Sequence, residues 1–159
     1  MMKSPRRPLL WGAFVGLTAL PASLPAATAA DAGLDRFRAT YKELVETNTT
    51  LSAGDCTLAA RRMETRLKAA GYPDADLHIF VPEGHPKEGG LLAVLHGSDA
   101  HAKGVLMLAH VDVVEARRED WTRDPFTLIE EDGYFYGRGT SDMKAQAGAA
   151  GQSRSRSTA

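Results

Sequence analysis

The stretch GVLMLAHVDVV, residues 104–114, joins a continuous apolar run to a histidine and an aspartate. An apolar run without alternation predicts a central β-strand that is covered on both faces. His110 and Asp112 are two positions apart, so in a strand their side chains point to the same face. Because ligands of open α/β sheets bind beyond the carboxyl ends of the strands, we expect this pair to face a binding site.

The sequence on both sides of this stretch predicts an α/β domain in which helices and sheet form layers. Two amphipathic helices are expected first, the second with Asp55 as its N-cap, and two shorter strand-like runs follow them. Asp132 and Gly133 predict the turn of a later β-hairpin, and a further helix begins near Ser141. The expected helices and strands before that last helix cover residues 31–50, 55–70, 76–82, 90–97, 104–114 and 126–137, and the polar run at 47–54 is expected to close the first helix.

The first thirty residues have the three-part composition of a secretory signal peptide. The basic start MMKSPRR precedes the apolar run PLLWGAFVGLTAL, and small residues follow up to a cleavage site after Ala29 or Ala30. The apolar run is shorter than the roughly 20 residues of a membrane span, so we expect export to the periplasm or the exterior without a membrane anchor. The alternative is a buried N-terminal helix. We assign residues 1–30 to the signal peptide, 31–150 to one domain and 151–159 to an unstructured tail.

The composition is that of an ordinary globular protein, with 43% hydrophobic and 25% charged residues and a net charge of -1. This balance gives no indication of nucleic acid or of a membrane surface as a partner. Cys56 is the only cysteine, which excludes an internal disulfide and a metal site built from several cysteines. The stability of the mature chain is therefore expected to come from its apolar core, or from a bound metal. The sequence leaves the oligomeric state open.

A second group of polar residues, YGRGTSDMK at 136–144, follows the expected hairpin. The glycines on either side of Arg138 permit a tight backbone path, and Asp142 falls at a helix start, where the dipole favours a carboxylate. Two interpretations are open for His110 and Asp112: a hydrogen-bonded pair without further role, or a metal ligand with its supporting carboxylate. Asp142 is correspondingly a helix-terminal acid or a second ligand.

Taken in order, these motifs resemble the di-zinc amidohydrolase and exopeptidase family of acetylornithine deacetylase, succinyl-diaminopimelate desuccinylase, aminoacylase and glutamate carboxypeptidase. The resemblance is dense over residues 104–147, where HVDVV, W, DPF, DG, YGRG and SDMK appear in the family's order and spacing. It implies a layered helix-sheet-helix catalytic domain of the zinc-exopeptidase type, with residues 31–150 as its N-terminal part. It also implies hydrolysis of an amide or peptide bond in a small peptide or an N-acyl amino acid.

The resemblance implies roles for three residues. His110 matches the histidine ligand of one zinc ion, and Asp112 matches the catalytic acid that orients this histidine. Asp142 matches the carboxylate that bridges two zinc ions, which lie about 3.5–4 Å apart in two-metal sites. Zinc is therefore the expected cofactor, with other divalent metals as alternatives.

The sequence departs from the family after the SDMK motif. The resemblance implies a later general-base glutamate, two more acidic ligands and a last histidine ligand, yet no His, Asp or Glu follows Lys144. Glu130 and Glu131 precede Asp142 and are not expected to replace that pair. A catalytic zinc normally has three protein ligands, and general-base catalysis needs a positioned proton acceptor. We therefore expect a truncated fragment, incomplete at its C-terminus and inactive or nearly so; the alternatives are a non-catalytic remnant and a small metal-binding module.

The remaining candidates have structural interpretations. Trp121 and residues 124–126 are expected in a wall or loop, Arg138 is expected to pack or pair nearby, and Cys56 is expected to be a small packed residue. Near Asp99, two of the other histidines could bind adventitious metal. All four of these histidines are expected at the surface: His78, His85, His96 and His101.

Overall fold

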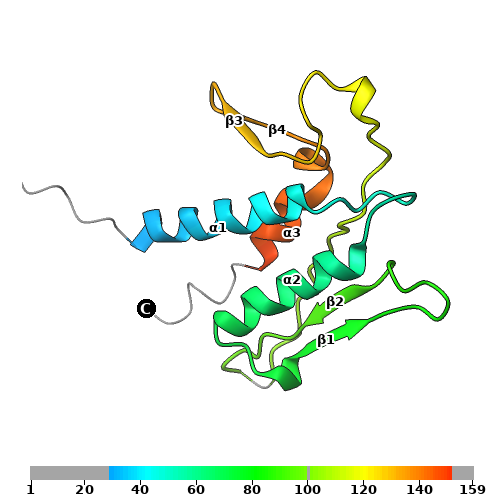
Figure 1. Cartoon of the computed structure of the whole chain (residues 1–159). Helices are drawn as coiled ribbons and strands as arrows, with labels where there is room; N and C mark the ends of the chain where they lie inside the picture. Colours follow the sequence, from blue (N-terminus) through cyan, green and yellow to red (C-terminus); the bar gives the residue numbers. More distant parts are fainter. Residues whose placement is uncertain (1–28, 100, 152–159) are drawn as a thin grey trace, which may run out of the picture.

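The computed structural model describes residues 29–99 and 101–151 (Figure 1). The signal peptide, apart from its last two residues, and nearly all of the expected tail lie outside these ranges and stay predictions. Within the described ranges, no helix is long and apolar enough to cross a membrane. The elements are α1 (Ala29–Glu46), α2 (Cys56–Ala69), η1 (Asp74–Asp76), β1 (Leu77–Phe80), β2 (Gly90–Ala93), η2 (Arg118–Asp120), β3 (Ile129–Glu131), β4 (Tyr134–Tyr136), η3 (Thr140–Lys144) and α3 (Ala145–Ala150).

Both predicted N-terminal helices are present. In α1 the apolar face buries Leu44 and Val45 almost completely, and the helix ends at Glu46, directly before the polar run that was expected to close it. In α2 the predicted N-cap is confirmed, since the Asp55 side chain accepts a hydrogen bond of 2.7 Å from the backbone N–H of Leu58. That bond satisfies one of the amide groups that a helix start leaves without a partner.

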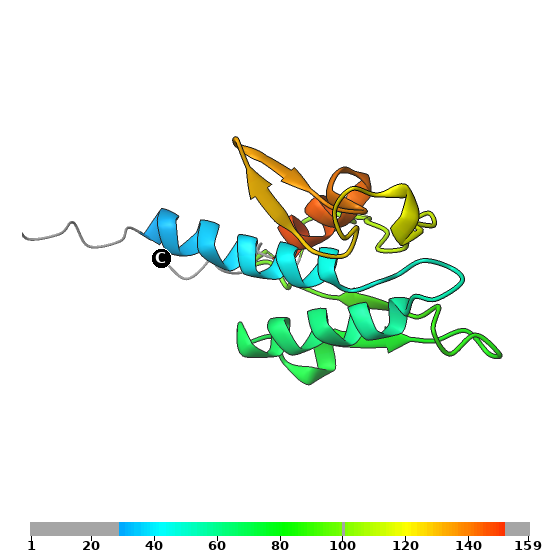
Figure 2. The same cartoon turned by 45° about the horizontal axis from the view of Figure 1, so that its top comes forward.

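The first two predicted strands form an antiparallel pair beneath α2. In β1 and β2, Leu77 lies opposite Ala93 and Phe80 lies opposite Gly90. Leu67 of α2 packs with Leu77 in a small buried cluster. Figure 2 shows α1 between this unit and the β3–β4 hairpin, so α1 joins the two parts of the molecule.

The predicted hairpin and its turn are also confirmed. β3 and β4 pair antiparallel, and Asp132 and Gly133 between them both have positive φ, at 53° and 79°. Positive φ at both central positions suits the right-handed twist of a two-residue hairpin. The hairpin is held to α1 by an edge-to-face contact between Phe135 and Tyr41, whose ring centroids are 5.3 Å apart.

The central strand predicted for residues 104–114 is wrong. This segment has no regular secondary structure, and Val105 and Leu108 are 89% and 79% exposed. A buried strand needs partners on both sides, and the strands of the described ranges pair only as β1 with β2 and β3 with β4. The predicted α/β class is therefore seen as helices with two small antiparallel sheets, while the helix-sheet-helix layering stays a prediction.

Leu108→Ala and Leu44→Ala should differ strongly in their effect on the free energy of unfolding. Leu44 is 1% exposed, so its truncation should cost about 2–5 kcal/mol. Truncation of Leu108 should change the value by less than about 0.5 kcal/mol, as at other exposed sites. Urea denaturation followed by circular dichroism measures both. Equal losses would show that residues 104–114 form a buried strand in solution after all.

Candidate functional site

The three residues singled out from the sequence lie together. His110 Nε2 is 3.0 Å from Asp142 Oδ1, and His110 Nδ1 is 3.1 Å from both the backbone carbonyl and Oδ1 of Asp112. Each ring nitrogen therefore faces an acceptor. The expected convergence of residues 110 and 142, which are far apart in the sequence, is present in the fold, with Asp112 on the opposite side of the ring.

The turn that carries Asp142 comes close to the 110–113 segment because it contains Gly139. This glycine has a φ of 82°, and a Cβ atom added to it would lie 2.6 Å from Cγ1 of Val113. Only glycine fits such a close approach in the left-handed region. The two glycines flanking Arg138 were predicted to give a tight path, and this close approach agrees with that prediction.

Asp142 does not lie in a regular helix, which corrects the expected position at a helix start. It belongs to the π-helical turn η3, in which Asp142 and Met143 have non-helical φ and ψ values and are joined by a cis peptide bond. Helix α3 begins only at Ala145. The helix dipole therefore does not explain the aspartate, whose side chain instead faces the His110 ring.

Lys144 is a structural residue of this site that the sequence did not predict. Its side chain is fully buried, and its Nζ donates a hydrogen bond of 2.8 Å to the backbone carbonyl of Thr47. Burial lowers the pKa of the Lys144 ammonium group to about 8. The buried lysine thus ties the turn that carries Asp142 to the segment that follows α1. The SDMK motif gave no signal for this burial, because lysine is usually exposed.

The carboxylates favour the charged form of His110. Desolvation is the largest single influence and lowers its pKa, but the hydrogen bonds to the Asp112 carbonyl and the Asp142 carboxylate, with the charges of both aspartates, outweigh it. The net result is a pKa raised above the ordinary value of 6.5. The site is open to solvent, since the side chains of His110, Asp112 and Asp142 are 46%, 71% and 87% exposed.

The donor set fits a zinc ion only in part. Imidazole nitrogen and carboxylate oxygen are both zinc ligands, at about 2.0–2.2 Å, so two of them at a tetrahedral angle lie about 3.3 Å apart. The 3.0 Å between His110 Nε2 and Asp142 Oδ1 is close to this value, and a small opening of the pair would admit the ion. Among the described residues, however, no three His, Cys, Asp or Glu side chains are arranged to hold one metal ion.

A cavity of about 680 Å³ opens beside His110 and Asp112. This volume lies within the usual range of small-molecule sites, about 300–1,000 Å³. Its walls come from the 109–113 segment, the start of α2 with Cys56, and the loop between β1 and β2 with Lys87. A second hollow of about 420 Å³ lies between α1, β4 and η3. The first cavity therefore gives a ligand access to the His110 side of the site.

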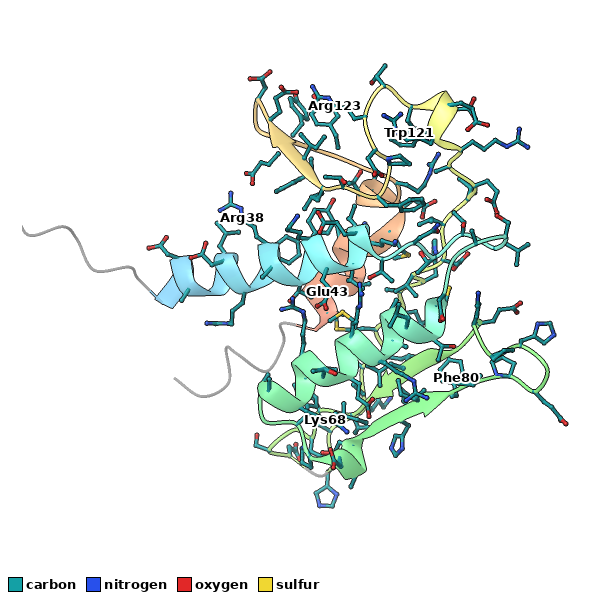
Figure 3. The ribbon with its side chains drawn as sticks, viewed as in Figure 1. Arg38, Glu43, Lys68, Phe80, Trp121 and Arg123 are labelled. Atoms are coloured by element: carbon teal, nitrogen blue, oxygen red, sulfur yellow. The ribbon has the colours of Figure 1, made fainter. Side chains whose placement is uncertain are left out.

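Trp121 and Arg138 contact each other, and neither lines the two cavities. The Arg138 guanidinium lies over the Trp121 ring at 5.0 Å, and the Arg138 backbone N–H donates to the Pro125 carbonyl at 2.7 Å. These contacts agree with the structural roles expected for Arg138 and the 124–126 loop. Figure 3 shows Trp121 on the η2 side of the molecule, away from Phe80 of β1.

The other candidates from the sequence are separate from this site. The four remaining histidines are exposed as predicted; His85 pairs with Glu88 at 2.9 Å and His96 with Asp76 at 3.0 Å. Glu130, on the hairpin, forms an ion pair of 3.1 Å with Arg38. This agrees with the exclusion of the Glu130–Glu131 pair from the chemistry.

Residues 106–153 match the family described as peptidase family M20/M25/M40. Acetylornithine deacetylase of Erwinia tasmaniensis is 38% identical over 113 residues, which are 70% of this chain and 29% of that enzyme. The Klebsiella pneumoniae acetylornithine deacetylase is 32% identical over a similar share. The human N-fatty-acyl-amino acid synthase/hydrolase is 42% identical over 46% of this chain and 14% of its own length.

Over residues 106–153 this chain is thus similar to peptidase family M20/M25/M40. The match includes Asp112 and Asp142 as well as His110, so the geometrically assembled site lies inside the family's segment. The chain spans less than a third of the length of the acetylornithine deacetylases to which it is similar. The resemblance that the sequence motifs indicated is thereby confirmed for this part of the family's proteins.

Asp142→Asn should lower the pKa of His110 in the metal-free protein. The raised pKa means that the histidine contributes stability below about pH 6.5, the value of the unfolded chain, and loses it as the pH rises through the folded-state pKa. An NMR titration of the His110 ring protons measures the change. Asp132→Asn removes the same charge from the hairpin turn and should leave the His110 titration unaltered; equal titrations in all three proteins would contradict the observed contact.

Proposed function

We propose that this chain carries part of the metal site of a zinc-dependent amidohydrolase or exopeptidase of the M20/M25/M40 family. The observation that supports the proposal is the contact of 3.0 Å between His110 Nε2 and Asp142 Oδ1, with Asp112 on the other ring nitrogen. A zinc-bound imidazole usually donates its other ring N–H to a carboxylate or a carbonyl group, as Nδ1 of His110 can do to Asp112.

In this proposal, His110 and Asp142 hold zinc and Asp112 orients the imidazole. Contact between Asp112 and Nδ1 fixes the ring and leaves Nε2 as the atom that faces the ion. The exposed second oxygen of Asp142 is available for a second cation. Zinc bound there would supply Lewis acidity for the hydrolysis of an amide bond.

The substrate class we propose is a small N-acyl amino acid or a small peptide. The names of the relatives point to N-acyl amino acids, since one class is acetylornithine deacetylase and another is an N-fatty-acyl-amino acid synthase/hydrolase. The cavity of about 680 Å³ beside His110 is large enough for such a molecule. We also propose that the protein is exported, on the basis of its basic, apolar and small-residue leader.

We further propose that this chain binds metal without completing the catalytic machinery. Among the described residues, no third His, Cys, Asp or Glu side chain joins His110 and Asp142, which leaves a zinc ion short of the usual three protein ligands. In this form the chain would act as a metal-binding module, or as a remnant if it does not bind metal.

Zinc should bind the 159-residue chain weakly at one site that depends on His110. Isothermal titration calorimetry should show this site in the unmodified protein, and His110→Ala should abolish it because Nε2 supplies a ligand. The matched control is His85→Ala, which removes another exposed histidine with a carboxylate partner and should retain the site. Zinc binding that is the same in all three proteins would exclude the proposed ligand.

Zinc-loaded chain should hydrolyse N-acetylornithine and dipeptides no faster than free zinc does. The reason is that the described residues place no further acid or histidine in one group with His110 and Asp142, and a positioned general base contributes typically about 10²–10⁴-fold. Amine release can be followed with a fluorogenic reagent. Turnover that is lost in His110→Ala but retained in His85→Ala would show that the residues of this chain are sufficient for catalysis. That result would contradict the metal-binding-module proposal.

A further inference from the structure

Residues 47–50, with the sequence TNTT, form a buried polar segment between the two halves of the site. Thr47, Thr49 and Thr50 are 3%, 1% and 5% exposed, in the polar run that was expected to close the first helix. Buried hydroxyl groups are costly unless they are hydrogen-bonded. The partners of these threonines therefore indicate what the segment does.

Thr49 holds the strand-like end of the 110–113 segment with two hydrogen bonds. Its Oγ1 donates to the Val111 carbonyl at 2.6 Å, and its carbonyl accepts from the Val113 N–H at 3.2 Å. These bonds lie on either side of Asp112, whose carbonyl and carboxylate face Nδ1 of His110. Thr49 thus fixes the backbone position from which Asp112 contacts the ring.

The same segment also holds the turn that carries Asp142. The Thr47 carbonyl accepts the hydrogen bond from the buried Lys144 ammonium group. At the other end of the turn, the Tyr41 hydroxyl donates to the Thr140 carbonyl at 2.8 Å. The turn around Asp142 is therefore held at both of its ends. The segment that follows α1 contributes to both halves of the site, because Thr47 binds Lys144 and Thr49 binds the backbone on either side of Asp112.

We propose that Thr49 is a positioning residue of the metal site: its hydroxyl aligns Asp112 and, through it, the His110 ring for metal binding. This inference rests on the proposed function. The hydrogen bonds of Thr49 to this region go to the Val111 carbonyl and the Val113 N–H and not to His110 or Asp142, so it acts through the 111–113 backbone. Loss of an outer hydrogen-bonding partner of this kind typically weakens metal binding about 10–100-fold.

A matched set of variants separates positioning from simple packing. Thr49→Val removes the hydroxyl at nearly constant volume, whereas Thr49→Ser keeps it. Thr57→Val is the control for burial: Thr57 is 8% exposed, and its hydroxyl donates to the Pro86 carbonyl at 2.8 Å and accepts from Gly89. It supports the 84–90 loop of the same cavity but not the 110–113 segment.

The first measurement is the calorimetric zinc affinity of the 159-residue chain, with the melting temperature recorded for each variant. We expect Thr49→Val to weaken the His110-dependent binding of zinc about tenfold or more. Thr49→Ser should stay within about threefold of the unmodified chain, and Thr57→Val should keep its zinc affinity even though its melting temperature falls. Equal zinc affinities in Thr49→Val and Thr57→Val would overturn the inference and leave the proposed metal site intact.

The second measurement is made without metal, by NMR. Thr49→Val should shift the His110 ring signals and speed hydrogen exchange of the Val113 amide, and Thr57→Val should do neither. If the unmodified chain shows no His110-dependent zinc binding, the proposed metal site fails, and this comparison alone tests the positioning role. An unchanged His110 ring and Val113 exchange rate in Thr49→Val would then overturn it.

Discussion

The candidate site depends on the hydrogen bonds between Thr49 and the backbone of residues 111–113. The apolar run that leads into His110 has no strand beside it among the described residues, so nothing on that side fixes its course. Thr49 supplies one donor and one acceptor in the manner of a short strand pair. Because the Val111 carbonyl and the Val113 N–H are both satisfied, the residue between them is held toward the histidine.

The polar character of this inner region has a consequence for stability. Lys144 and the threonines of the 47–50 segment occupy positions that hydrophobic residues usually fill. Burial of each of these polar groups is tolerated only because a hydrogen-bonding partner is present. The ammonium group of Lys144 has the highest cost of burial because it can carry a charge. The arrangement therefore specifies one geometry for the Asp142 turn, since any other geometry would leave a buried charge without its acceptor.

An exposed apolar run leads directly into the open site. Val105 to Leu108 are at least 64% exposed, and a contiguous apolar stretch of this kind usually marks a contact surface. The run ends at His110, so this exposed apolar surface borders the open side of the candidate site.

Local features of this protein followed from the sequence alone. Asp55 caps α2 because its side chain reaches an amide only three residues further along the chain. Asp132 and Gly133 form the hairpin turn because both residues readily adopt the positive φ angles that the turn needs. The resemblance to the family also followed from the order and spacing of short motifs, and the three residues that these motifs singled out lie together.

The tertiary structure alone decided the state of residues 104–114 and the roles of Thr49 and Lys144. The apolar run predicted a strand, but a strand forms only when another strand offers its N–H and C=O groups, and none in the described ranges does so. The sequence around a threonine or a lysine does not indicate whether its side chain is buried. Whether it is buried depends on which distant carbonyl comes within hydrogen-bonding distance, and that is fixed only when the chain has folded.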